Sequence, residues 1–325
     1  MLGAGAPLLV VLTGPTGSGK SELALQLAER LEATLPLEIL SFDSAQVYRG
    51  MDIGTAKPAP AQRARVRHHL IDIRDPADTY CAGEFVRDAH AAIADIQARG
   101  HQPLLVGGTM LYLRALYQGL APLPPASAAV RREFDEQARR DGWPALHQQL
   151  ARIDPAAAAR IAPADAQRIQ RALEVHRLTG VPLSAWLHTT RGDCGDRDRF
   201  RWLRYALLPA GTAARAVLRE RLAARFAGML EAGLMDEVRR LYARGDLTAQ
   251  HPSMRAVGYR QLWQVLAAGA SLEQAQRQAV IASAQLAKRQ LTWLRREQAL
   301  ITLPDISDVG RVEALAADIL AACRE

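Results

Sequence analysis

Cysteine is scarce in this chain of 325 residues, and no apolar run is long enough to span a bilayer. Cys81, Cys194 and Cys323 lie far apart without CxxC spacing, so we expect no zinc site, no disulfide framework and a reducing compartment. The apolar run from Leu8 to Leu12 follows no basic segment or cleavage pattern. We therefore expect a cytoplasmic protein with no membrane partner.

Acidic residues are nearly missing from one stretch. Between His251 and Arg296 the single acid is Glu273, which leaves this stretch a net charge of +6 in a chain whose total is +7. Its seven basic residues are Arg255, Arg260, Arg277, Lys288, Arg289, Arg295 and Arg296. A localised positive region is typical of a surface that binds a polyanion.

The remaining composition is that of a folded protein. Hydrophobic residues make up 49% and charged residues 23%, which excludes a disordered or collagen-like chain. The length predicts about two domains. No heptad or large apolar stripe demands a second copy, so we expect a monomer.

The first part of the chain alternates between apolar strands and amphipathic helices, which predicts a parallel α/β sheet flanked by helices. The expected strands are Leu8–Thr13, Glu38–Phe42, His69–Ile73 and Pro103–Val106. The expected helices are Ser21–Leu35, Ala82–Arg99 and Met110–Tyr117.

A proline-rich connector, Gly119–Ser127, ends this pattern, and helical spacing without strands then runs from Ala128 to about His188. Phe200–Leu208 reads as a strand that returns to the sheet. We therefore expect a phosphate-loop α/β core of residues 1–120 and 200–325 and an inserted all-helical subdomain of residues 121–199.

The strand Leu8–Thr13 leads into a full GxxxxGK[ST] motif, which is followed by a helix as that motif requires. The motif consists of Gly14, Pro15, Thr16, Gly17, Ser18, Gly19, Lys20 and Ser21. Its backbone N–H groups and Lys20 suit phosphate oxygens, and Ser21 suits Mg²⁺. A kinase would also carry an apolar strand that ends in Asp, and the sequence has none, since Asp72 lies in a weak strand. The motif therefore predicts a phosphorylated ligand but does not identify it as ATP.

Asp43 directly follows the second expected strand, whose carboxyl end faces the same crevice as the phosphate loop. Asp43 is therefore expected to point at the ligand. The alternative is that this Asp caps a turn.

Six motifs together resemble the tRNA dimethylallyltransferases, also called tRNA isopentenyltransferases, in order and approximate spacing. They are GPTGSGKS, DSAQVYRGMDIGTAKP, GGTMLYLRAL, DAQRIQRALEV, MRAVGYRQ and KRQLTWLR, and the resemblance runs from about Pro7 to Arg296. Gly17 and Ala45 depart from the family pattern, and we expect no zinc-finger extension like that of some eukaryotic members.

The resemblance implies transfer of a dimethylallyl group from dimethylallyl diphosphate to N6 of the adenosine 3′ to a tRNA anticodon. Mg²⁺ and the phosphate loop would neutralise the departing diphosphate. Asp43 is the candidate general base for the exocyclic amine. Thr109 is a candidate to hydrogen-bond to the base or to the bridging oxygen; the alternative is that it caps the helix from Met110. Arg225 resembles a phosphate clamp.

By the same resemblance several segments contact tRNA, whose target base must leave its stack. The expected positions are Asp43, Ser44, Ala45, Gln46 and Thr109 near the base, Arg131, Gln167, Arg168, Ile169, Gln170 and Arg171 in the insertion, then Arg255, Ala256, Val257, Gly258, Tyr259 and Arg260, and finally Lys288, Arg289, Gln290, Leu291, Thr292, Trp293, Leu294 and Arg295. The alternatives are a merely solvated basic face and a core position for Tyr259.

Three other functions share some of these features. A small-molecule kinase would share the phosphate loop, and a free-nucleotide prenyltransferase would share the chemistry without needing the insertion. A nucleotide switch that binds RNA without catalysis would keep the basic surface and tolerate the loss of Asp43.

Overall fold

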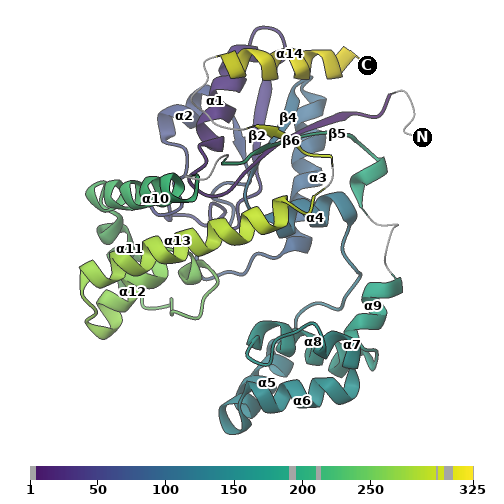
Figure 1. Cartoon of the computed structure of the whole chain (residues 1–325), viewed down its shortest axis with the longest axis vertical. Helices are drawn as coiled ribbons and strands as arrows, with labels where there is room; N and C mark the ends of the chain where they lie inside the picture. Colours follow the sequence, from purple (N-terminus) through teal and green to yellow (C-terminus); the bar gives the residue numbers. More distant parts are fainter. Residues whose placement is uncertain (1–4, 190–194, 210–213, 298, 304–309, 325) are drawn as a thin grey trace. The chain divides into compact units, whose positions relative to one another are not determined.

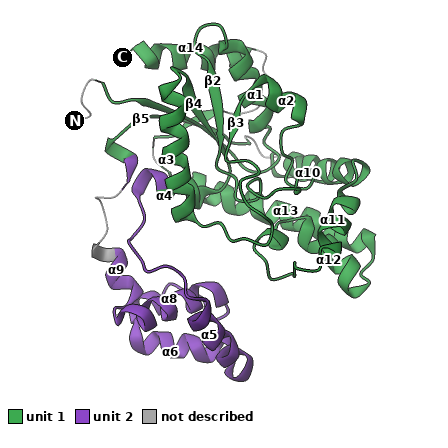
Figure 2. Cartoon of the chain, turned by 180° about the vertical axis from the view of Figure 1, so that it is seen from behind, with its two compact units in different colours: residues 1–115, 197–325 green, residues 116–196 purple. Residues whose placement is uncertain are grey.

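A computed structural model of the chain describes residues 5–189, 195–209, 214–297, 299–303 and 310–324. Two compact units make up the fold, one of residues 1–115 and 197–325 and the other of residues 116–196 (Figure 2). Cys194 lies outside the described residues, whereas Cys81 and Cys323 are free and exposed. Within the described ranges, every helix is too short or too polar to cross a bilayer.

The larger unit is built on a six-stranded sheet in which every neighbouring pair is parallel. Its strands are β1 (Leu8–Thr13), β2 (Leu37–Ser41), β3 (His68–His69), β4 (Gln102–Gly107), β5 (Arg201–Leu207) and β6 (Ile301–Leu303), in the order β3-β2-β4-β1-β5-β6. β1 lies at the centre, where all six of its residues are buried. The predicted α/β class is confirmed.

One predicted strand is mostly wrong. His69–Ile73 was expected to be extended, but β3 ends at His69. Leu70 and Asp72 have φ of 62° and 59°, in the left-handed region, so the chain turns immediately after the edge strand. The short edge strand β6 was not expected, because three residues carry too little pattern to be recognised.

Helices cover both faces of this sheet (Figure 1). They are α1 (Lys20–Leu31), α2 (Pro60–Arg65), α3 (Ala82–Ala98), α4 (Met110–Gln118) and α14 (Gly310–Arg324). Apolar residues of β1, α1 and α14, among them Val10, Leu27 and Ile319, form one continuous core. Burial of this core fixes the carboxyl ends of β1, β2 and β4 side by side.

A further group of helices lies beyond those strand ends, comprising α10 (Ala214–Glu231), α11 (Leu234–Ala243), α12 (Tyr259–Ala268) and α13 (Leu272–Leu294) (Figure 1). The hydroxyl of Ser271 caps α13 by accepting from the Gln274 N–H. Leu218 and Leu222 of α10 pack with Ala287 of α13, which gives this group its own apolar contact. A 3-10 turn, Ser253–Arg255, precedes α12.

The smaller unit is helical, with α5 (Ala128–Asp141), α6 (Trp143–Ile153), α7 (Pro155–Ala158), α8 (Ala166–Thr179) and α9 (Leu183–Thr189). Its core includes Phe134, Leu146, Leu150 and Ile169. The chain enters and leaves this unit through adjacent segments, because Gly195 lies against the backbone of Tyr117, Gln118 and Gly119, where a Cβ would collide.

Candidate active site

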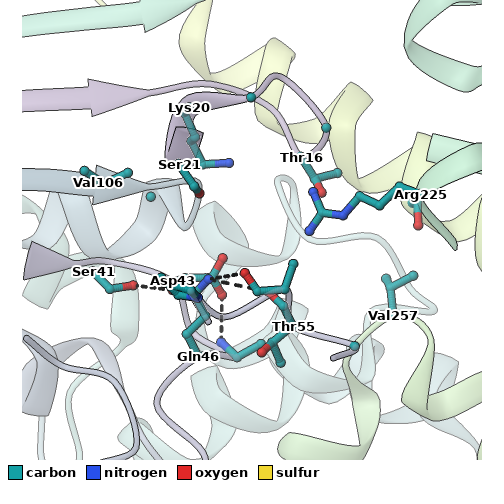
Figure 3. Close-up of a pocket in the computed structure, with 18 of the residues that line it drawn as sticks. Thr16, Lys20, Ser21, Ser41, Asp43, Gln46, Thr55, Val106, Arg225 and Val257 are labelled. Carbon is teal, nitrogen blue, oxygen red and sulfur yellow. Dashed lines mark hydrogen bonds between the residues drawn. The ribbon is translucent and has the colours of Figure 1, made fainter. Parts of the chain in front are cut away.

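A cavity of about 390 Å³ opens at the carboxyl ends of β1, β2 and β4, within the larger unit. Its walls come from the GxxxxGKS loop, the loop after β2, residues 54–58 and helices α10 and α13. Figure 3 shows Lys20 and Arg225 entering this cavity from two sides, with Asp43 close by. The volume lies in the range usual for small-ligand sites.

The phosphate loop begins where β1 ends and closes onto the first turn of α1. Gly17 and Gly19 have φ of 77° and 80°, which side-chain-bearing residues rarely adopt. This backbone lets Lys20 and Ser21, the first two residues of α1, line the cavity. The positive end of the helix dipole and these groups together form a binding site for an anion.

Two cations face the cavity without a carboxylate partner within 4 Å among the described residues. Desolvation by the surrounding protein lowers the pKa of Lys20 to about 8, an effect that Asp43 opposes and Arg225 reinforces. Desolvation likewise lowers the pKa of the Arg225 guanidinium on α10, although its side chain keeps exposed surface toward the cavity. Because burial disfavours the charged forms of these unpaired side chains, an anion bound between them would stabilise both charges.

Asp43 follows β2, lines the cavity and is held by its own loop, where its Oδ1 accepts from the Ala45 N–H at 2.9 Å. Thr109, after β4, accepts from the Ser44 N–H at 3.0 Å and donates to the Ser44 Oγ at 3.2 Å. Thr109 itself is not one of the cavity-lining residues. Its hydroxyl instead fixes the residue adjacent to Asp43.

Gln46 presents its amide to the same cavity. Ser41 Oγ donates to Gln46 Oε1 at 2.8 Å, and Gln46 Nε2 approaches the carbonyls of Thr55 and Ala56 at 3.4 Å. These contacts join the loop after β2 to the DIGTAK segment. The rest of the lining is largely apolar and includes Val106, Leu222, Phe226, Met229, Val257 and Leu286.

Glu237 on α11 holds the DIGTAK segment and was not identified from the sequence. Its carboxylate, only 1% exposed, accepts from the N–H groups of Asp52, Ile53 and Gly54 at 2.8, 2.9 and 3.2 Å. It also accepts from the Tyr259 hydroxyl at 2.5 Å. Desolvation and this carboxylate raise the pKa of Tyr259 far above its usual range, so the phenol remains a donor. Tyr259 is thus a core residue.

Lys57, at the end of the same segment, has a buried side chain that binds the Tyr48 carbonyl and the carboxylates of Asp52 and Asp72. Asp72 also accepts from Arg63. Asp72 is therefore occupied in this ion-pair cluster and is not one of the cavity-lining residues.

Gln290, on the inner side of α13, binds two loops at once. Its Oε1 accepts from the Thr16 N–H at 2.8 Å, and its Nε2 donates to the Gly108 carbonyl at 2.9 Å. The side chain is 8% exposed. Leu294, one turn later, is also buried. Gln290 also lines the cavity, whereas Leu294 does not.

The outer side of the same helix is basic. Its exposed cations are Lys288 and Arg289, followed by Arg295 and Arg296 just beyond the helix. Thr292 is also exposed, and its hydroxyl donates to the Lys288 carbonyl. The Arg114 guanidinium lies 5.6 Å from the centre of the half-buried Trp293 ring, and Leu291 is also half-buried.

The MRAVGYR segment divides between the cavity and the surface. Ala256 and Val257 line the cavity, whereas Arg255 and Arg260 are exposed. Arg255 donates to the Gln250 carbonyl at 2.8 Å. Gly258, with φ of 93°, connects the two parts at a backbone angle that suits glycine.

In the smaller unit, Gln167 and Arg168 are exposed and Ile169 is fully buried. Arg131 and Arg171 both donate to the buried carboxylate of Glu174. Burial raises the pKa of Glu174, but these hydrogen bonds outweigh it and lower the pKa.

Gln170 is likewise engaged within the unit, where it donates to the Arg131 carbonyl and to Asp135. Of the insertion residues expected at RNA, Gln167 and Arg168 are the two most available. Ile169, Tyr259, Gln290 and Leu294 have buried side chains.

Among the described residues, no group of three His, Cys, Asp or Glu side chains could hold a metal ion. The oxygen donors of the cavity include the Ser21 hydroxyl and the Asp43 carboxylate. Mg²⁺ usually combines one or two protein oxygens with substrate phosphates and water. This donor set therefore fits Mg²⁺ that arrives with a phosphorylated ligand.

Comparison with known proteins places these features in a family. The model for IPP transferases matches residues 46–297. The tRNA dimethylallyltransferase of Bordetella petrii is 53% identical over 315 residues, which cover 96% of this chain and 98% of that protein.

Two solved structures are also similar. The tRNA isopentenylpyrophosphate transferase of Bacillus halodurans has a TM-score of 0.69 at 34% identity and covers 98% of this chain and 97% of its own. A eukaryotic dimethylallyltransferase acting on tRNA has a TM-score of 0.75 at 26% identity and covers 97% of this chain and 80% of its own.

Proposed function

This chain belongs to the IPP transferase family, and on that premise we propose that it is a tRNA dimethylallyltransferase. The proposed reaction moves a dimethylallyl group from dimethylallyl diphosphate to N6 of the adenosine 3′-adjacent to a tRNA anticodon. Its products are N6-isopentenyladenosine in tRNA and diphosphate.

One observation carries the proposal: two unpaired cations, Lys20 and Arg225, face the same cavity as the carboxylate of Asp43. The cations and the phosphate loop suit a diphosphate, and the carboxylate suits a group that loses a proton.

The apolar part of the cavity supports a prenyl donor. Leu222, Phe226 and Met229 of α10 contribute to it, together with Val257 and Leu286. A five-carbon chain placed there is removed from water, which favours binding and protects the reacting allylic carbon from attack by water.

In the proposed step, the bond between the allylic carbon and the bridging oxygen breaks while the N6 nitrogen forms a bond to that carbon. The electron pair of the broken bond leaves with diphosphate, whose growing charge Lys20 and Arg225 stabilise. The proton lost from the amine passes to Asp43, which its bond to the Ala45 N–H keeps in place.

Mg²⁺, held by Ser21 and the diphosphate oxygens, would supply further positive charge to the leaving group. Because the chain offers few ligands of its own, we propose that the metal binds together with the diphosphate.

For the RNA, we propose that the adenosine leaves its stack and enters beside Gln46, whose amide can recognise a base edge. The exposed cations of α13 and the MRAVGYR segment would hold the flanking phosphates. We also propose that the helical insertion contacts the anticodon stem-loop through Gln167 and Arg168.

The test is incubation of the purified protein with Mg²⁺, labelled dimethylallyl diphosphate and unmodified tRNA, alongside separate reactions with AMP and with ATP. The expected result is label in tRNA alone. Label in AMP would instead support a free-nucleotide prenyltransferase. Consumption of ATP without movement of label would support a kinase or ATPase and would contradict the proposal.

A further inference from the structure

Gln290 connects the phosphate loop to the loop after β4, whose Thr109 in turn supports the loop that carries Asp43. The oxygen of its side-chain amide accepts a hydrogen bond from Thr16 in the phosphate loop, and the nitrogen donates one to Gly108 in the loop after β4. We propose that Gln290 is a positioning residue that fixes the distance between the diphosphate cradle and the base. This inference rests on the proposed function.

The first contact bears on the diphosphate. Thr16 lies four residues before Lys20, within the same tight loop, and lines the cavity. Without Gln290 its N–H would lose its protein acceptor, and the loop would lose a tether to a long helix. A cradle that shifts by a fraction of an ångström weakens every N–H contact to the phosphate oxygens.

The second contact bears on the base. Gly108 precedes Thr109, whose hydroxyl binds both the N–H and the Oγ of Ser44, the residue next to Asp43. A Cβ at position 108 would collide with Gln290 Nε2. The absence of a side chain at this position therefore admits the glutamine, which then holds the Thr109 loop in register with the phosphate loop.

Gln290 lines the cavity, but both ends of its amide are hydrogen-bonded to the protein, which separates its role from that of the exposed cations. Its side chain is 8% exposed, whereas Lys288 and Arg289, the residues two and one before it, are exposed. Successive residues on a helix point about 100° apart, so one turn of α13 presents cations outward and the amide inward. Loss of the amide should affect diphosphate binding and catalysis more than tRNA binding.

The test compares Gln290→Met, which keeps the length and removes both hydrogen bonds, with Gln285→Met on the exposed side of the same helix. For each protein we would measure pyrophosphate affinity with Mg²⁺, the KM for each substrate, kcat and the melting temperature. For Gln290→Met the expected result is an affinity for pyrophosphate about tenfold weaker and a kcat about tenfold lower. The KM for tRNA should stay within about twofold of wild type, and Gln285→Met should match wild type throughout.

Gln290→Glu gives an independent readout that packing alone would not produce. Its carboxylate can still accept from Thr16 but repels the Gly108 carbonyl. Protonation restores a donor, and an apolar setting raises the pKa of a carboxyl group. Its kcat relative to wild type should therefore recover as the pH falls from about 8 to about 6. Lys20 is present in both proteins, so the ratio reports chiefly the titration of the introduced carboxyl group.

Pyrophosphate affinity and kcat equal to wild type in Gln290→Met would overturn the inference. A rise confined to the KM for tRNA would also overturn it, in favour of a direct RNA contact. If Gln290→Met does not fold, the kcat of Gln290→Glu relative to wild type decides. A relative kcat that fails to recover at low pH would then contradict the positioning role. Wild-type protein that transfers no label to tRNA would refute the proposed function and leave the pyrophosphate measurements to judge the cradle.

Discussion

Asp43 and Lys20 line one cavity beyond the ends of β2 and β1, between which β4 lies in the sheet. The Asp43 carboxylate raises the pKa of the Lys20 ammonium against the desolvation that lowers it to about 8. The charge of the cradle thus depends on the residue proposed as the base. A negatively charged ligand stabilises the protonated lysine, and the protonated lysine attracts that ligand, so proton binding and diphosphate binding are linked.

Pyrophosphate affinity should depend on pH through Lys20. A lysine is charged below its pKa, so binding should be strongest below about pH 8 and weaken as the pH rises through that value. Titration calorimetry between about pH 7 and 10, with Mg²⁺ held constant, measures this. In Lys20→Arg the guanidinium stays charged, so its affinity should lack this fall. If pyrophosphate affinity fell equally with rising pH in both proteins, the pH dependence would belong to the ligand and not to Lys20.

Replacing Asp43 by Asn should leave tRNA affinity nearly intact and reduce the chemical step about 10²-fold or more, the scale of a lost general base. The Asn side-chain oxygen can still accept from the Ala45 N–H, so the loop keeps its shape. Single-turnover transfer of label to bound tRNA is the appropriate measurement. A rate equal to wild type would remove Asp43 from the mechanism.

The basic side of α13 should bind RNA phosphates. Lys288→Ala combined with Arg295→Ala should weaken tRNA binding and reduce the slope of log affinity against log salt by about 2, one for each phosphate that the protein no longer neutralises. Arg30→Ala is a matched control, because Arg30 is an exposed cation that pairs with Glu313 on α14. An unchanged slope in the double variant would mean that these cations are only solvated.

The Glu237–Tyr259 pair should stabilise the fold and shape the site. Tyr259→Phe removes one hydrogen bond and should lower the free energy of unfolding by about 1 kcal/mol. Glu237→Gln places an NH₂ group against backbone N–H groups and should cost more, about 1–3 kcal/mol. Urea denaturation of both variants tests this order. A free energy of unfolding of Glu237→Gln equal to that of wild type would show that the segment Asp52–Gly54 holds its shape without the carboxylate.

Local patterns were sufficient for much of the fold. The run Leu8–Thr13 is apolar throughout and stops at a glycine, so the bounds of β1 followed from the sequence. The helix Ala82–Arg99 was predicted to within one residue because its apolar spacing is regular. His69–Ile73 failed because left-handed turns at Leu70 and Asp72 leave no mark in an apolar pattern.

The supporting residues of the site had no local signal. Gln290 and Thr16 are 274 positions apart, and Glu237 and Asp52 are 185 apart, so only the folded chain brings them together. A buried carboxylate and a buried amide look like surface residues in a helical pattern. Tyr259 had two open interpretations, and its position beneath Gly54, where a Cβ would meet its ring, decides for the core.

The close approach of Gly195 to the backbone of Tyr117–Gly119 has a consequence for protein engineering. The helical insertion is joined to the rest of the chain by two adjacent segments. Every residue lining the cavity belongs to the other unit. A chain in which a short glycine linker replaces residues 120–194 would retain the whole cavity. Insertions from relatives could be exchanged at this junction, and the exchanged chains would show whether this unit sets the choice of RNA.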